Sequence, residues 1–109
     1  MDILIIDTEV RVLGCLMEKE IATPDYYPLS LNALTNACNQ KSNRDPIVDY
    51  DEETVVRALE GLKEQQLTRQ SNVSRVPKFE QSFTVSHKLV KREAAVLCVL
   101  LLRGPQTVG

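Results

Sequence analysis

The most constraining feature of this sequence is a change of periodicity at residue 67, between an amphipathic segment and an alternating one. Before this point, side chains recur at helical spacing along one face: Val55, Leu59, Leu62 and Gln66. Asp51 stands where a helix needs an N-cap, and the two glutamates after it fall in the first turn, where the helix dipole favours carboxylates. These signals predict a helix over residues 51–66.

After residue 67 the period becomes 2, which is typical of a strand with one buried face. The alternating side chains are Phe79, Gln81, Phe83 and Val85. A second, shorter run starts at Leu67, and the polar residues at 72–74 indicate a turn between the two runs. We therefore expect an antiparallel hairpin between residues 67 and 85, with Pro77 at its edge or tip.

Two further amphipathic segments precede this unit. They predict helices over residues 8–20 and 30–39, with Cys38 as a core thiol of the second helix. Gly14 lies inside the first helix at a cost of about 1 kcal/mol relative to alanine, so we expect another backbone to approach closely there. Tyr26–Leu29 is extended in pattern, and we interpret it as a short first strand.

The order of these segments predicts an α+β fold that is mostly helical, namely a winged helix-turn-helix domain over residues 1–86 with the hairpin as its wing. One departure is the connection Gln40–Tyr50, because a helix-turn-helix usually joins its helices with about three or four residues. Lys41 and Arg44 are the bases of this connection. They could pair with Asp45 and Asp49 inside an ordered loop, or they could form an anion site.

The last predicted helix covers residues 87–103 and is apolar on every side between Ala94 and Leu102. Such a helix is normally buried all round, but the domain before it can cover only one side. One interpretation is a two-fold homodimer in which Glu93–Leu102 pairs with its copy. The other is a longer protein, in which residues 87–109 open a second, incomplete domain.

Composition restricts the classes of function. The net charge is −2, but residues 1–67 carry 13 acids and 6 bases, whereas residues 68–109 carry 2 acids and 7 bases. An anion-binding surface should therefore lie in the hairpin or after it. No paired carboxylates stand in a recognisable catalytic motif, and the lone histidine, His87, has no evident partner. We expect no catalytic residue, no cofactor and no metal site, and hence no enzyme.

Cysteine usage and hydropathy indicate the compartment. The three cysteines are isolated, a pattern typical of reduced thiols in a cytoplasmic protein. The N-terminus lacks the positively charged segment of a signal peptide, and the apolar run Ala94–Leu102 is about half as long as a membrane span requires. We expect a cytoplasmic protein that does not enter a membrane.

Two kinds of partner suit the predicted fold, duplex DNA and another protein. The candidate nucleic-acid contacts are Lys41, Arg44, Arg57, Arg69, Arg75 and Lys78. The side of helix 51–66 that points away from the core disfavours DNA, because it is acidic and phosphate neutralisation supplies much of the affinity for DNA. That side carries Glu53, Arg57, Glu60, Gly61 and Glu64.

A row of amides follows the outer side of helix 30–39. Its members are Asn32, Asn36 and Asn39. Amide side chains can contact phosphates or base edges, but they also compete well for local backbone groups and could hold the neighbouring loop. Both interpretations stay open at this point.

Several stretches of the sequence resemble the YceH family of bacterial proteins. They are E-V-R-V-L-G-C-L-M-E-K-E at Glu9–Glu20, T-P-D-Y-Y-P-L-S-L-N-A-L-T-N-A-C-N-Q-K-S-N-R-D-P at Thr23–Pro46, S-R-V-P-K-F at Ser74–Phe79 and L-L-R-G-P-Q-T at Leu101–Thr107. The resemblance implies two winged-helix domains in tandem, the second of which opens near the last of these stretches. It implies no activity, cofactor or catalytic residue.

The function predicted from the sequence is a non-enzymatic, regulator-like module that binds nucleic acid through a basic wing. The alternative is a module of the same fold that binds another protein, which the acidic helix and the long connection favour.

Overall fold

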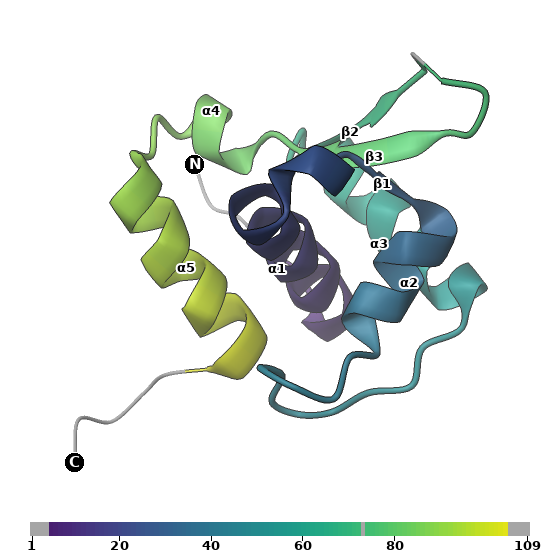
Figure 1. The fold of residues 1–109 in the computed structure, drawn as a ribbon, viewed down its shortest axis with the longest axis horizontal. Coiled ribbons are helices and arrows are strands. Elements are labelled where there is room, and N and C mark those ends of the chain that lie inside the picture. The colour runs from purple at the N-terminus through teal and green to yellow at the C-terminus, as the bar shows by residue number, and fades with distance from the viewer. Residues whose placement is uncertain (1–4, 73, 105–109) are drawn as a thin grey trace.

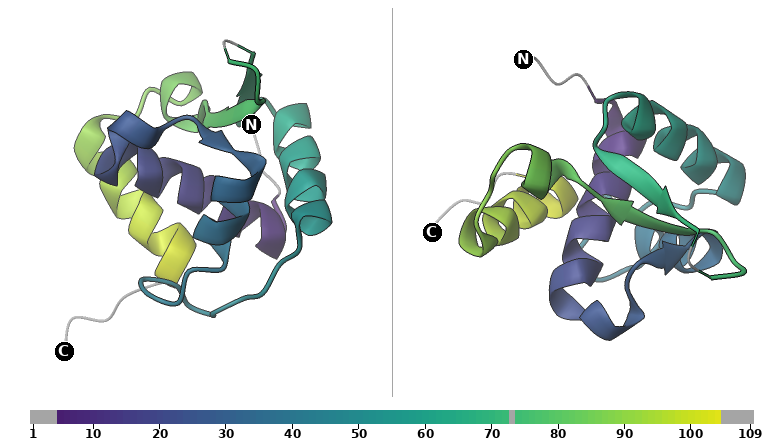
Figure 2. Two further views of the ribbon diagram at one scale, coloured as in Figure 1. Left: turned by 45° about the vertical axis from the view of Figure 1, so that its right-hand side comes forward. Right: turned by 90° about the horizontal axis from the view of Figure 1, so that it is seen from above.

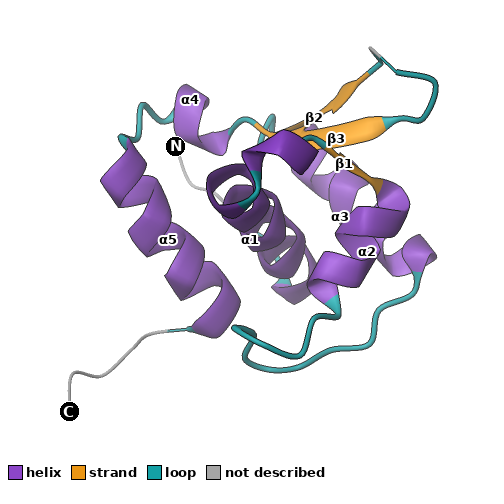
Figure 3. Ribbon diagram, viewed as in Figure 1, coloured by secondary structure: helices purple, strands orange, loops and turns teal. Residues whose placement is uncertain are grey.

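The computed structural model describes residues 5–72 and 74–104, which form a group of helices with a small sheet at one side (Figure 1, Figure 3). In chain order the elements are α1 (Asp7–Ala22), the 3-10 turn η1 (Pro24–Tyr26), β1 (Leu29–Ser30), α2 (Leu31–Cys38), α3 (Glu52–Glu64), β2 (Thr68–Ser71), β3 (Lys78–Gln81), α4 (Phe83–Ser86) and α5 (Lys91–Arg103). The predicted α+β, mostly helical class is confirmed. The helices predicted over residues 8–20, 30–39 and 51–66 correspond to α1, α2 and α3.

The three strands pair in the order β1-β3-β2, and both pairings are antiparallel. Phe79 of β3 lies at the centre of the sheet, opposite Leu29 on one side and Gln70 on the other. The first strand, predicted over Tyr26–Leu29, is shorter in the structure and begins only at Leu29. Tyr26 belongs instead to the 3-10 turn Pro24–Tyr26. We call residues 68–81, the β2–β3 hairpin, the wing; it extends beyond the helices (Figure 1).

Helix α1 runs through the centre of the molecule, with α5 on one side and α2 and α3 on the other (Figure 1, Figure 2). All residues from Arg11 to Met17 are buried, whereas a surface helix buries only one stripe. Helix α1 therefore needs other elements to pack against it on several sides. Helix α2 supplies Leu34 and Cys38, and α3 supplies Val55 and Leu62, each without exposed surface. The prediction that Cys38 is a core thiol is confirmed.

Helix α3 ends earlier than predicted, at Glu64, because Gln66 adopts the left-handed conformation with φ 61°. The Gln66 N–H donates to the Lys63 carbonyl at 2.9 Å, and the Leu67 N–H donates to the Leu62 carbonyl at 3.0 Å. These bonds form a Schellman motif, which turns the chain out of the helix and into β2. Gln66 is exposed, so its assignment to the apolar face of the helix was wrong.

Strand β3 is also shorter than predicted. It ends at Gln81, and Phe83 and Val85 lie in the short helix α4 instead of continuing the strand. The Gln81 side chain provides the reason, because its Oε1 accepts a hydrogen bond from the Thr84 N–H at 3.1 Å and so supports the first helical turn. The alternation of apolar residues alone could not reveal this local competition.

Helix α5 begins at Lys91, later than the predicted residue 87, and is buried on the side that faces α1 through Ala94, Cys98 and Leu102. Its other side is exposed. The exposed fractions there are 57% for Val96, 38% for Val99 and 43% for Leu100. Within the described residues, the preceding part of the chain thus covers one side of α5 only.

Gly14 lies where α1 and α5 come close together. A β-carbon at this position would lie 2.8 Å from Leu102 Cδ2 and 3.1 Å from Leu101 Cβ, which is tighter than side chains normally pack. The Cys98 thiol also donates to the Gly14 carbonyl, with Sγ 3.6 Å from the oxygen. Helix α5 does approach Gly14 closely, but the prediction of a backbone neighbour was wrong, because the nearest atoms belong to the side chains of Leu101 and Leu102.

Candidate functional site

The basic residues predicted to contact nucleic acid fall into three groups. Lys41 and Arg75 are exposed, and Lys78 is half-buried. Arg57 and Arg69 are exposed, but each forms an ion pair with a carboxylate. Arg44 is buried, with 6% of its surface exposed. The structure therefore does not present these residues as one set of available cations.

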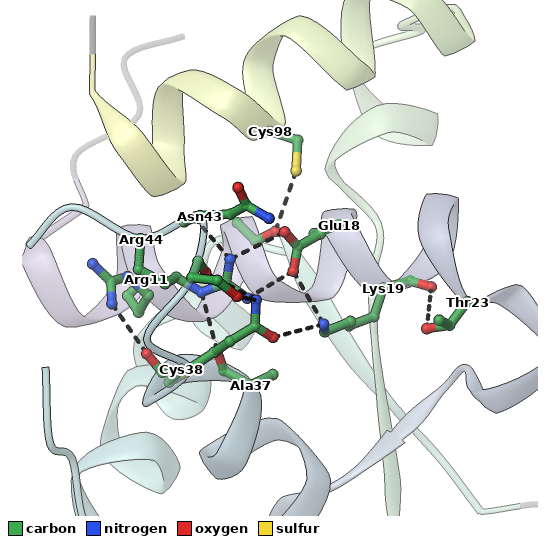
Figure 4. A network of polar contacts seen from close by, with 12 residues as sticks. Arg11, Glu18, Lys19, Thr23, Ala37, Cys38, Asn43, Arg44 and Cys98 are labelled. Atoms are coloured by element: carbon green, nitrogen blue, oxygen red, sulfur yellow. Dashed lines mark hydrogen bonds and ion pairs between the residues drawn. The ribbon is translucent and has the colours of Figure 1, made fainter. Parts of the chain in front are cut away.

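Arg44 reaches from the α2–α3 loop, residues 39–51, to Glu18 on α1 (Figure 4). Its Nη2 lies 2.6 Å from Glu18 Oε1 and its Nη1 lies 3.0 Å from Glu18 Oε2, a two-pronged ion pair. Its Nε donates to the Ala37 carbonyl at 3.1 Å. Arg44 therefore has no exposed group to offer a phosphate, and the predicted pairing with Asp45 or Asp49 is wrong because Glu18 takes that role.

Glu18 and Arg44 both stay charged although they are removed from solvent. Burial alone would raise the pKa of Glu18, but hydrogen bonds from Arg44 and its positive charge outweigh this and hold the pKa below its ordinary value. For Arg44, burial would lower the pKa, but the hydrogen bond to Glu18 raises it. Lys19 adds a second positive charge, with Nζ 3.2 Å from Glu18 Oε1. The pair is therefore a structural link in its charged form.

A second buried arginine, Arg11 of α1, was not identified from the sequence. Its Nη1 donates to the Cys38 carbonyl at 3.0 Å, and its Nη2 donates to the Pro46 carbonyl. Arg11 thus connects α1 to the middle of the α2–α3 loop. It also connects α1 to the end of α2, a contact drawn in Figure 4. The available signal was a lone base within an otherwise apolar run, Val10–Met17.

The amide of Asn39 holds the far end of the same loop. Its Nδ2 donates to the Tyr50 carbonyl at 2.8 Å, and its Oδ1 accepts from the Tyr50 N–H at 2.7 Å. The loop-holding interpretation of the amide row is confirmed at Asn39. Asn32 and Asn36 are exposed, and their side chains contact each other at 3.5 Å.

The outer side of α3 is acidic in the structure as well as in the sequence. Glu53, Glu60 and Glu64 are exposed, and Arg57 is bonded to Glu53 one turn away. Gly61 does not belong to this side, contrary to the sequence prediction. It faces the buried Glu9 of α1, whose carboxylate occupies the space that a β-carbon at Gly61 would need.

On the wing, Arg69 lies directly opposite Glu80 in the strand pairing. Arg69 Nε donates to Glu80 Oε1 at 2.6 Å, so the positive charge is matched within the hairpin. Arg75 and Lys78 lie nearer the tip. No carboxylate pairs with either of them in the part of the chain that the structure describes.

The surroundings of the three cysteines act on their thiols in different ways, and a hydrogen bond with Cys38 lowers the pKa of Cys15. All three are free and buried, and burial raises the pKa of Cys98 to about 11, which keeps this thiol protonated at neutral pH. Across residues 5–72 and 74–104, no group of three or more His, Cys, Asp or Glu side chains is placed to hold a metal ion. No helix formed by these residues is long and apolar enough to cross a membrane.

Comparison with known proteins gives a consistent assignment over nearly the whole chain. A family model described as "Protein of unknown function, DUF480" matches residues 5–109. A UPF0502 protein from Solibacter usitatus is 67% identical over 102 residues, which cover 93% of this chain and 50% of the relative.

Two further relatives show the same partial coverage. A UPF0502 protein from Geotalea daltonii is 60% identical over 110 residues, covering 100% of this chain and 50% of the relative. One from Opitutus terrae is 59% identical over 105 residues, covering 94% of this chain and 46% of the relative. The chain spans about half the length of the curated relatives it matches.

Proposed function

The chain belongs to the DUF480 family, which is the YceH family of bacterial proteins, and we propose that it is a non-enzymatic winged-helix module that binds another protein. The observation that carries this proposal is the exposed acidic side of α3. In a winged helix that reads DNA, this side would lie in the major groove. Here it carries Glu53, Glu60 and Glu64, and its arginine is already paired.

The order of the elements supports the winged-helix part of the proposal. The chain runs α1, β1, α2, α3, β2, β3, and the strands pair as β1-β3-β2. Helix α3 then occupies the place of the second helix of a helix-turn-helix, directly before the wing. The long α2–α3 loop is compatible with this arrangement because Arg11, Arg44 and Asn39 hold it against the helices.

Charge supports a protein partner over duplex DNA. DNA binding gains much of its affinity from counterions released when lysine and arginine neutralise phosphates. Arg44, Arg57 and Arg69 already neutralise carboxylates of this chain. The exposed glutamates would also lie close to two rows of phosphates, which repel them. A partner with lysine or arginine at the contact would be attracted instead.

Nucleic acid is the second candidate, because Arg75 and Lys78 are not paired with a carboxylate within the described residues. Wing-led binding through these two side chains and Lys41 would be independent of base sequence. If the partner is a protein, we expect the positive charges of Arg75, Lys78 and Lys41 to contribute little to the binding free energy.

Salt-dependent binding separates the two candidates. A fluorescent duplex of about 20 bp would be titrated with the protein at several salt concentrations, and the slope of log affinity against log salt measured. We expect no more than weak binding with a slope near zero. A steep slope that becomes shallower by about one unit for each of Arg75→Ala and Lys78→Ala would overturn the protein-partner proposal.

The exposed side of α5 supports a further proposal, that the 109-residue chain forms a two-fold homodimer through Glu93–Leu102. Val96, Val99 and Leu100 remain exposed there, and burying a leucine is worth about 1.5–3 kcal/mol. Sedimentation should show a dimer that Leu100→Glu converts to a folded monomer. A wild-type monomer at high micromolar concentration would contradict this. In the longer relatives, the part outside the match is the competing candidate for covering this side.

A further inference from the structure

A pocket of about 190 Å³ lies between α3 and the wing. Its apolar floor comes from Val56 and Leu59 of α3 and from Phe79 of β3. Glu60, Lys63, Thr68, Arg69 and Gln70 complete its walls. Arg69 and Gln70 are neighbours in a strand, so their side chains point to opposite faces of the sheet. Since both line the pocket, it opens at the free edge of β2.

Strand β2 lies at the edge of the sheet, because the order is β1-β3-β2. The Ser82 N–H donates to the Leu67 carbonyl at 2.9 Å, which fixes residues 67 and 82 as a hydrogen-bonded pair. Antiparallel pairs alternate, so Arg69 and Ser71 bond to β3 while the N–H and C=O of Thr68 and Gln70 point outward. Thr68 is buried, but Gln70 is exposed and can form a bridge with an added strand.

On the α3 side, the pocket and the turn beyond it carry two glutamates, of which Glu64 lies outside the lining, and one lysine. Glu60 lines the pocket and Glu64 follows it one turn later, and both are exposed. The nearby arginines do not cancel this charge, because Arg57 pairs with Glu53 and Arg69 pairs with Glu80. Lys63 is the one further base in the lining of the pocket. An incoming segment with lysine or arginine beside its anchor would find carboxylates within reach.

From these three features we infer that the groove between α3 and β2 binds an extended, basic segment of a partner protein. One apolar side chain of the segment fills the pocket over Phe79, its main chain bridges to Gln70, and its flanking bases meet Glu60 and Glu64. This mode of recognition combines main-chain pairing at a sheet edge with a side-chain pocket. The inference rests on the proposed function and specifies the class of partner.

The test uses a fluorescent, capped nonapeptide with a central leucine, β-branched neighbours and two lysines at each end. Binding is followed by fluorescence anisotropy, and its location by the amide resonances of the ¹⁵N-labelled chain. We expect the largest shifts at Val56, Gln70 and Phe79. Replacing the peptide lysines with glutamate, or its leucine with aspartate, should weaken binding at least ten-fold.

Two variants of the chain test the two parts of the contact. Glu60→Lys should weaken binding roughly five-fold, whereas Asp45→Lys, the same charge change at an exposed position of the α2–α3 loop, should change it less than two-fold. Gln70→Pro removes one outward N–H that β3 does not use, and should also weaken binding roughly five-fold. Unfolding curves of each variant show whether the fold is kept.

The outcomes separate this inference from the proposed function. One outcome is that Glu60→Lys weakens binding while Gln70→Pro has no effect and the Gln70 amide resonance does not shift. The groove is then not the binding site, but the proposal that α3 binds a basic protein partner is retained. If no basic peptide binds and duplex DNA binds with a steep salt slope, both fail. If a thymidine oligonucleotide shifts the groove amides more strongly than the peptide, the occupant is nucleic acid and the inference is overturned.

Discussion

In the α2–α3 loop a buried arginine and a half-buried asparagine are bonded to other parts of the chain, whereas in the wing the same residue types are exposed. Arg44 bonds to Glu18 and to main-chain carbonyls, and Asn39 holds Tyr50. Arg75 and Asn72 are exposed. The difference lies in the hydrogen-bond acceptors that surround each position in the fold, and not in the side chains themselves.

This contrast shows how a long connection can be part of the core. A buried charge destabilises a protein unless its hydrogen-bonding groups are satisfied. Within the described residues, no buried side-chain nitrogen or oxygen lacks a hydrogen-bond partner. The loop therefore contributes specific, satisfied contacts to stability, whereas in the wing Arg75 and Lys78 pair with no carboxylate among the residues that the structure describes.

The largest effect is expected for Arg44→Ala. The change removes the two-pronged partner of the partly buried Glu18 carboxylate and leaves it only the contact with Lys19. Breaking a buried ion pair typically costs about 3–5 kcal/mol of unfolding free energy. Urea unfolding measures this cost directly. The matched wing variant Arg75→Ala should stay within about 0.5 kcal/mol of the wild type. Equal losses for the two arginines would show that the loop and the wing do not differ in this way.

A smaller effect is expected for Asn39→Ala. The change removes two hydrogen bonds and leaves the Tyr50 N–H and C=O unpaired, at a cost of about 1–3 kcal/mol. Hydrogen exchange at the Tyr50 amide should become faster. Asn36→Ala is the control from the same helix, because Asn36 is exposed, and it should leave this amide protected. A Tyr50 amide that exchanges equally fast in both variants would contradict the role of Asn39.

The third experiment concerns pH. The pKa of Glu18 is lowered in the folded state, so its contribution to stability is fully present above the unfolded pKa of about 4.3. It is lost as the pH falls through the lower, folded value. The difference in urea midpoint between the wild type and Glu18→Gln should therefore be largest at neutral pH and shrink below about pH 4. A difference that is constant down to pH 3 would contradict the charged link.

The smallest effect is expected on the wing. Arg69 and Glu80 form an exposed cross-strand pair, and such pairs are worth about 0.2–1 kcal/mol. A double-mutant cycle with Arg69→Ala and Glu80→Ala measures the coupling. High salt should reduce it, because exposed charges are screened. A coupling as large as that of Arg44 with Glu18 would remove the distinction between the two regions.

The sequence predicted the local elements better than the contacts between them. The helical period of α1, α2 and α3 and the hairpin were visible, because these patterns repeat over a few residues. Arg44 was misjudged because its partner Glu18 lies 26 positions away. Gly61 was misjudged for the same reason, since Glu9 fills the space beside it. The acidic side of α3 was visible in the sequence. The pocket over Phe79 was not, because it forms only where α3 meets β2 and β3.

The close contact at Gly14 has a consequence for variation among relatives. A β-carbon at residue 14 would collide with Leu102, so the two positions should change together. An alanine at the position of Gly14 should occur mainly with a smaller side chain at the position of Leu102, and a glycine with leucine. An aligned set of family sequences should therefore show covariation between these positions, although they lie 88 residues apart by their numbers. Helix α5 would then have evolved together with the centre of α1, and not as a separable appendage.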